Sequence, residues 1–177
     1  LPTDPSVYSI ILNKMRCFDQ VFLTKDDQKR NQSYLDNKLR LSLKEKLIDK
    51  DDWLKKLNTK IEIDKLNSLN SKRVSQLFNK TNQFNLSTRR LTEEQINCFY
   101  EKKENELITI SVTDKFGDLG LVGLIGINLN KENVLIVVDL ILSCRAMGRG
   151  IEETMLYLIN NKVEEFFAKH FIIKYIK

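Results

Sequence analysis

A glycine-bearing turn near the end of the chain is the segment best suited to chemistry. The turn, Ser143–Gly150, follows an apolar stretch and precedes a helix-forming segment. Glycines at Gly148 and Gly150 let the backbone approach a ligand, and free N–H groups at a helix start attract an anion. Arg145 and Arg149 add side-chain donors for the same anion. The turn therefore predicts a phosphate-binding site, with tight packing of strand against helix as the alternative.

Two residues near this turn are candidates for catalysis. Cys144 ends the apolar stretch beside the arginines, and neighbouring positive charge favours the nucleophilic thiolate. The alternative for Cys144 is a small buried core residue, because cysteine is among the most buried residue types. Asp139 interrupts the apolar stretch 134–142, where a carboxylate is either a general base or the partner of an arginine.

A run of amides and arginines further upstream is a candidate substrate-binding patch. Its members are Asn82, Gln83, Asn85, Arg89 and Arg90. Such side chains can line a cleft for a polar substrate, or they can cap the ends of a strand. Asp118 is a further candidate, although aspartate is common in turns for purely local reasons.

The elements that position these residues change in type along the chain. Before residue 105 the sequence is rich in lysine, asparagine and leucine, and all six glycines come after it. Helical patterns and caps precede the change, and runs of valine and isoleucine follow it. We expect helices over 6–17, from Thr24 onward, and over 52–57, 71–79, 92–103 and 151–169. We expect strands over 107–113, 121–129, 134–142 and 171–176, with weaker strand signals at 84–88 and, in isolation, at 61–63.

Composition and charge exclude several classes of protein. The net charge is +5, but lysines alternate with acids and no arginine stripe with interleaved aromatics occurs, so we expect no nucleic-acid partner. A basic surface of this kind suits an acidic protein, such as an acyl carrier protein. The longest apolar run is too short to span a membrane. Three scattered cysteines and one histidine provide neither a disulfide framework nor a metal site, which favours a cytoplasmic protein.

The turn does not match two other phosphate-binding motifs. A dinucleotide fingerprint needs a third glycine, and a P-loop needs Gly-Lys-Ser/Thr. The order strand-helix-strand-strand-strand, then turn and helix, resembles the GNAT acyltransferases, and Arg145-x-x-Gly148-x-Gly150 satisfies that superfamily's Arg/Gln-x-x-Gly-x-Gly/Ala pattern. The resemblance implies an α/β fold with a mixed sheet, and coenzyme A or a phosphopantetheine thioester beside the strand before the turn. A second register places Glu152 where a glycine is expected, and its carboxylate would repel the pyrophosphate of coenzyme A.

Three segments together are similar to the C-terminal part of the FkbH-like family: residues 73–90, 114–123 and 142–152. Members of that family join an N-terminal haloacid-dehalogenase-like phosphatase domain to a GNAT-like domain. The resemblance implies transfer of a glyceryl unit to an acyl carrier protein for methoxymalonyl-type polyketide extender units. It also marks Asp118 and the residues of the upstream patch as characteristic.

The resemblance implies a division of the chain and a function. Residues 1–80 are expected to be a helical extension that follows a phosphatase domain, since no phosphatase nucleophile motif occurs in the sequence. Residues 81–177 are expected to be a GNAT-like domain that lacks its last strands. The leading function is acyl transfer to or from a phosphopantetheine thioester on a carrier protein. The alternatives are a non-catalytic module that docks a carrier protein and an acetyl-CoA-dependent N-acetyltransferase.

Overall fold

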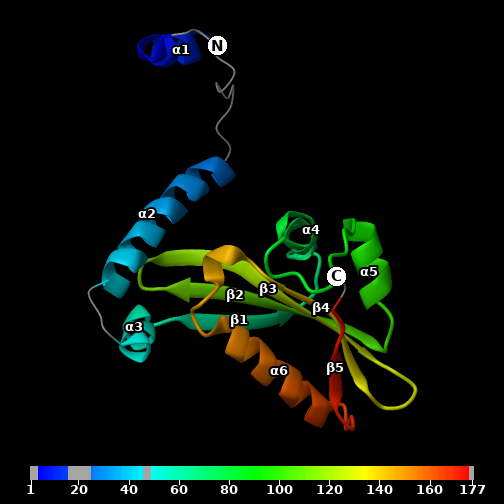
Figure 1. The fold of residues 1–177 in the computed structure, drawn as a ribbon. Coiled ribbons are helices and arrows are strands. Elements are labelled where there is room, and N and C mark those ends of the chain that lie inside the picture. Colours follow the sequence, from blue (N-terminus) through cyan, green and yellow to red (C-terminus); the bar gives the residue numbers. More distant parts are fainter. Residues whose placement is uncertain (1–3, 16–24, 46–48, 176–177) are drawn as a thin grey trace.

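The computed structural model describes residues 4–15, 25–45 and 49–175 of the chain (Figure 1). The first part is helical, as predicted. It contains a 3-10 helix at Pro5–Val7 and three α-helices: α1 (Tyr8–Met15), α2 (Lys25–Glu45) and α3 (Lys50–Leu57). The residues expected to end the first helix, 16 and 17, lie outside the described part.

Helix α2 buries polar rather than apolar side chains. The leucines that recur every fourth residue mark the helix correctly, but Leu35 and Leu39 are exposed. Among the side chains of α2 that the structure describes, those of Asp36 and Arg40 are buried. Leucine spacing therefore predicts the helix, while its attachment to the rest of the molecule depends on charged groups.

A five-stranded mixed sheet forms the second part of the molecule. Its strands lie side by side in sequence order: β1 (Lys60–Lys65), β2 (Asn105–Asp114), β3 (Gly117–Leu129), β4 (Leu135–Leu142) and β5 (Phe171–Ile173). The first four are antiparallel to their neighbours, and β5 runs parallel to β4. The strands predicted after residue 105 are confirmed, with β5 shorter than expected.

The short strand signal at residues 61–63 belongs to this sheet. The structure extends it to Lys60–Lys65 and pairs it along β2, so the expectation of an isolated strand was wrong. Three alternating residues could not reveal a partner more than forty positions away. Strand β1 and the helix that follows it lie within residues 1–80, which are expected to form an extension. In the structure, β1 is part of the sheet and the helix covers it.

Helices cover both faces of the sheet (Figure 1). On one face lie α4 (Ser71–Lys80) and α5 (Glu93–Tyr100), whose apolar residues pack with Leu107, Leu124 and Ile141. The other face carries α6 (Ile151–Glu165), which packs through Ile151, Met155 and Ile159. The predicted capping box of α5 is present, because Thr92 and Gln95 bond reciprocally.

Two segments share the outer edge of β4. Its first half pairs with β5. Its second half bonds to residues 84–86: the N–H of Leu86 donates to the carbonyl of Leu140 at 3.1 Å, and the N–H of Leu142 donates to the carbonyl of Phe84 at 2.9 Å. The weak strand signal in this region thus corresponds to a single bridge in a loop, not to a strand.

Two features are absent from the part of the chain that the structure describes. None of its helices combines the length and the apolar character that crossing a bilayer requires. No cluster of three or more His, Cys, Asp or Glu side chains suitable for a metal ion occurs among the same residues.

Candidate functional site

The predicted phosphate turn has the backbone that an anion site requires. After β4 come a 3-10 turn, Cys144–Ala146, and the glycines Gly148 (φ 72°) and Gly150 (φ 78°), both left-handed. A Cβ at either glycine would meet no atom within 4 Å, so the space above them is open. The N–H groups of Ile151 and Glu153, at the start of α6, have no acceptor among the described residues. This arrangement fits a phosphate.

A carboxylate of the chain itself already occupies part of this turn. Oε1 of Glu152 accepts a hydrogen bond from the N–H of Gly148 at 2.7 Å. Oε2 of the same side chain is buried and has no partner among the described residues. The turn thus holds one negative charge before any ligand arrives, and that charge opposes a heavily phosphorylated one.

Cys144 lies at the surface beside the turn. Its side chain is exposed, so the alternative of a buried core cysteine is wrong. Arg145, the next residue, is largely enclosed, and its Nε is buried without a hydrogen-bond partner among the described residues. Burial, and then the positive charge of Arg73, lower the pKa of Arg145, while the charges of Cys144 and Asp118 act in the opposite direction.

Arg149 is directed away from the turn, toward helix α2. Its Nη1 lies 3.4 Å from Oδ2 of Asp114, and its Nη2 donates to Oδ1 of Asn37 at 3.1 Å. The carboxylate of Asp114 also accepts hydrogen bonds from Nε and Nη2 of Arg40, at 2.6 Å and 2.7 Å. Burial and the charge of Arg40 lower the pKa of Arg149. Arg149 therefore joins the turn to α2, and its contribution to phosphate binding stays a prediction.

Asp139 is the centre of a buried polar cluster on the face of the sheet that carries α4 and α5. Its carboxylate accepts hydrogen bonds from both Nε and Nη2 of Arg89 and from the hydroxyl of Tyr100. Burial, and then the charge of Asp139, raise the pKa of Tyr100 strongly, so its hydroxyl stays protonated and donates. Gly126 makes room for the cluster, since a Cβ there would lie 1.9 Å from the Tyr100 hydroxyl oxygen.

This cluster accounts for the aspartate that interrupts an apolar strand. Burial alone would lower the pKa of Arg89, but the hydrogen bond and charge of Asp139 outweigh it and raise that pKa. Of the two roles expected for Asp139, the structure shows pairing with an arginine, and the arginine is Arg89. From Asp139 to Leu142 the strand advances roughly 10 Å, at about 3.3 Å per residue. Asp139 therefore lies well inside β4, whereas Cys144 comes after its end.

In the upstream patch, the side chains of Arg90 and Asn85 form hydrogen bonds with neighbouring parts of the chain. Arg90 donates to the carbonyls of Phe78 and Thr81 and to the side chain of Asn82. Asn85 is buried. Its side-chain nitrogen donates to the carbonyl of Thr81, and its oxygen accepts from Ser87 and from the N–H of Thr88.

Of the patch residues, only Gln83 is exposed and without a partner among the described residues. The side chains of Asn82, Asn85, Arg89 and Arg90 instead bond within the chain. These contacts favour the capping alternative over a cleft lined by all five side chains. Asp118 is exposed and accepts a hydrogen bond from the N–H of Gly120 at 2.6 Å, a local turn contact.

Two residues near the site carried no signal in the sequence. Tyr100 lies at the end of a short amphipathic helix, where an aromatic residue is ordinary. Arg73 lies in α4, donates to Oε1 of Gln76 at 2.9 Å, and points its Nε at the carbonyl of Leu121 at 3.4 Å. Leu121 is in β3, next to Val122, whose carbonyl accepts a hydrogen bond from the N–H of Ser143, so Arg73 reaches the region of Arg145.

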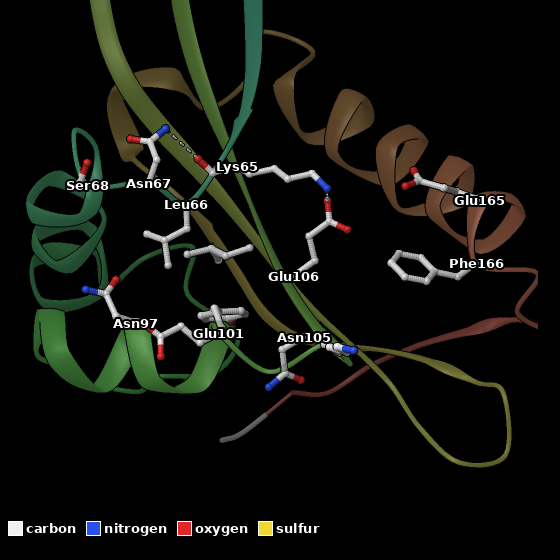
Figure 2. A pocket seen from close by; sticks show the side chains of 13 residues that line it. Lys65, Leu66, Asn67, Ser68, Asn97, Glu101, Asn105, Glu106, Glu165 and Phe166 are labelled. Atoms are coloured by element: carbon white, nitrogen blue, oxygen red, sulfur yellow. Dashed lines mark hydrogen bonds and ion pairs between the residues drawn. The ribbon is translucent and has the colours of Figure 1, made fainter.

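A pocket of about 680 Å³ lies at the opposite end of the sheet (Figure 2). Its lining includes the ends of β1 and α6 and the start of β2, whereas the glycine turn follows the end of β4. One carboxylate of its lining, Glu106, is paired with Lys65 at 3.1 Å and with Lys162 at 2.9 Å. We assign no chemistry to this pocket, because it lies away from the glycine turn and its Glu106 is held by two lysines.

Comparison with solved structures identifies the fold. The chain resembles an acetyltransferase from Trypanosoma brucei (TM-score 0.50, 10% identity, 67% of this chain and 84% of that one). It is equally similar to a transcriptional regulator from Bacillus halodurans C-125 (TM-score 0.50, 13% identity, 67% and 83%). A possible acetyltransferase from Clostridium difficile 630 also matches (TM-score 0.50, 12% identity, 66% and 80%).

These likenesses confirm the expected GNAT-like fold. No protein-family model matches the sequence, and no curated protein matches it. At such low identity the likeness extends to the fold alone, and the neighbours carry different names. The function must therefore be argued from the site.

Proposed function

We propose that this chain transfers an acyl group to or from the phosphopantetheine thioester of an acyl carrier protein. The fold is that of acyltransferases, and the glycine turn offers open space and free N–H groups to one phosphate. The observation that favours a carrier protein over free coenzyme A is the bond from Gly148 to Glu152. Coenzyme A carries three phosphate groups and the carrier arm carries one, so the Glu152 carboxylate repels coenzyme A more strongly.

The resemblance to the FkbH-like family adds a substrate to this proposal. In that setting the acyl group is a glyceryl unit, delivered to the chain from a preceding phosphatase-like domain. The net charge of +5 suits an acidic carrier protein, because opposite charge steers such encounters. Arg145, Gly148 and Gly150 would hold the phosphate of the arm.

The thioester arm needs a path beside β4. The second half of the β4 edge is bonded to residues 84–86, through the N–H of Leu142 and the carbonyl of Leu140. An arm that runs along this edge therefore replaces residues 84–86 as the partner of these two groups. The amide groups of pantetheine supply the same donor and acceptor types as the peptide they displace.

Cys144 is the residue proposed to accept the acyl group. Its thiolate attacks the carbonyl carbon of the thioester. A new bond forms from Sγ to that carbon, the bond to the sulfur of the arm breaks, and the released sulfur takes a proton. The exposed position of Cys144 and the adjacent Arg145 support this role.

Replacing Cys144 by alanine should abolish the covalent acyl adduct. Intact-protein mass spectrometry of the complete enzyme with its acyl donor measures that adduct directly. Cys98→Ala is the matched control, because Cys98 is also an exposed free cysteine and lies on α5, away from the turn. If the adduct persists in Cys144→Ala and in every other cysteine variant, the docking-module alternative is favoured. The engagement of Asp139 with Arg89 already supports that alternative, because it leaves Asp139 less available as a general base.

Replacing Glu152 by glutamine should strengthen binding of coenzyme A by about tenfold or more, since a negative charge within roughly 5 Å of the phosphates is removed. Affinity for the carrier protein should change much less. Isothermal titration calorimetry of both ligands measures the two effects. Glu153→Gln is the control, because Glu153 is exposed and lies in the same turn of α6. Equal gains for both ligands, or none for coenzyme A, would contradict a selective role of Glu152.

A further inference from the structure

Three charged side chains are buried together where helix α2 meets the glycine turn. Asp114, at the end of β2, lies between Arg40 of α2 and Arg149 of the turn. The side chains of Asp114, Arg40 and Arg149 are 1%, 3% and 7% exposed. A buried group of this kind adds little net stability over apolar side chains, because taking charges out of water costs about as much as their attraction returns. It therefore points to a role in fixing one particular geometry.

Arg149 is the member of this group that belongs to the turn itself. It stands between Gly148 and Gly150, and both glycines have a left-handed backbone. Glycine has the most conformational freedom of all residues, so a turn with two of them adopts one shape only if something holds it. The Arg149 side chain is held by Asp114 at 3.4 Å and by Asn37 of α2 at 3.1 Å. These contacts restrict the glycine on each side and, with them, the N–H groups that open α6.

Helix α2 is itself fixed to the turn between β2 and β3. Nη2 of Arg40 points at the carbonyl of Gly117 at 3.4 Å, and its guanidinium group lies 6.0 Å from the centre of the Phe116 ring. The carboxylate of Asp36 fills the place that a Cβ at Gly117 would need. Because these contacts hold α2 against the sheet, the position of α2 is passed on to the glycine turn through Asn37.

We propose that α2 positions the glycine turn for the phosphate: Asn37 and Asp114 hold the side chain of Arg149, and Arg149 fixes the turn. These three are positioning residues, since they act through the backbone of the turn and not on the reacting atoms. The proposal rests on the proposed binding of the arm's phosphate at this turn. A site that is already ordered loses less free energy on binding, so its affinity depends on whether α2 is in place. Such coupling is reciprocal, so a phosphate at the turn also holds α2 more firmly.

Asn37→Ala tests the link with little disturbance of the fold, because Asn37 is exposed and its oxygen accepts the hydrogen bond from Arg149. The variant should bind phosphopantetheine about fivefold to thirtyfold more weakly, the cost of ordering the backbone of one residue on binding. Isothermal titration calorimetry measures this change. Ser42→Ala is the matched control, because Ser42 is exposed on α2 and bonds only to the carbonyl of Leu39 among the described residues. It should bind as the wild type does.

A double-mutant cycle shows whether Asn37 acts through Arg149. In an Arg149→Met background, Asn37→Ala should cause no further loss of affinity, because the group that Asn37 holds is already gone. An equal loss in both backgrounds would overturn the proposal, since α2 would then act on the ligand by another route.

Hydrogen exchange tests the same link without a ligand. In Asn37→Ala, the N–H groups of Gly148 and Thr154 should exchange about fivefold faster, because their bonds to Glu152 and to the carbonyl of Gly150 depend on an ordered turn. In the wild type, phosphopantetheine should slow exchange in the described residues of α2, and Asn37→Ala should remove this effect. Exchange at the turn that is the same in wild type and variant would contradict the proposal.

The results also separate this proposal from the proposed function. If the wild type binds phosphopantetheine and Asn37→Ala binds it equally well, the coupling to α2 is wrong and the phosphate site stands. If the wild type does not bind phosphopantetheine, the phosphate site fails, and the positioning role proposed for α2 fails with it.

Discussion

Asp139→Asn should destabilise the protein by about 3 kcal/mol, near the lower end of the range for removing one partner of a buried ion pair. The Asp139 side chain is fully buried, and the variant leaves the Arg89 guanidinium, whose side chain is 27% exposed, without its counter-charge. It also weakens the acceptor for the hydroxyl of Tyr100. Urea unfolding followed by circular dichroism gives the free energy of unfolding for wild type and variant.

Two companion variants show whether the effect belongs to the cluster. Tyr100→Phe removes only a hydroxyl, so it should cost about 1 kcal/mol. In an Arg89→Met background the cost of Asp139→Asn should shrink, because the charge to be balanced is already gone. A stable Asp139→Asn variant that has nevertheless lost acyl transfer would show that Asp139 is the general base after all, and not a residue that positions the loop.

Asp114→Asn should detach helix α2 from the sheet and cost roughly 3 kcal/mol, because it leaves Arg40 and Arg149 without their shared carboxylate. Trp53, the single tryptophan, reports on this region: it is buried, and the ammonium of Lys44 on α2 lies 5.3 Å from its ring centre. The tryptophan emission of the variant should therefore shift to longer wavelength. Unchanged emission would show that α2 is held by other contacts.

The same ion pair predicts a dependence of stability on pH. Burial would raise the pKa of Asp114, but the hydrogen bond from Arg40, the N–H of Phe116 and the nearby arginine charges hold that pKa below its usual value. A carboxyl whose pKa is lowered in the folded state contributes stability that is present above about pH 4 and is lost as the pH falls below it.

The free energy of unfolding of the wild type should therefore decrease as the pH falls below about 4. Asp114→Asn should lose less stability over the same pH range. Glu106→Gln is a useful comparison, because the pKa of Glu106 is also lowered, by Lys162 and Lys65 against the opposing effect of burial. An identical pH profile for wild type and Asp114→Asn would contradict a charged contact between α2 and the sheet.

The elements of the fold follow from local patterns, and most of them could be predicted. The capping box at Thr92 and the glycine turn before α6 are signals contained in a few neighbouring residues, so the sequence locates them well. An aspartate within an apolar strand also indicates a buried partner. It could not indicate which one, because Arg89 lies 50 positions away and several arginines are equally suitable.

The contacts that hold the site together were not predictable for the same reason. Arg40 and Asp114 are separated by 74 positions, and a chain with many lysines, arginines and acids offers no local reason to pair these two. Arg73 and Tyr100 sit on ordinary amphipathic helices, where only the packing of α4 and α5 on the sheet brings them to the site. The sequence shows that Glu152 is unusual in the turn, but only the structure shows its bond to the N–H of Gly148.

The loop segment 84–86 also affects how the protein behaves in solution. A strand edge with free N–H and C=O groups is a template on which a second copy of a chain can add, and this is a common start of aggregation. The end of β4 is apolar and would present such an edge, but Leu86 and Phe84 bond to it. Arg89, anchored on Asp139, and Arg90, anchored on the carbonyl of Phe78, hold the loop against the sheet. A ligand that displaces the loop would cover the same edge of β4. The edge is therefore protected from pairing with a second copy of the chain, both with and without the ligand.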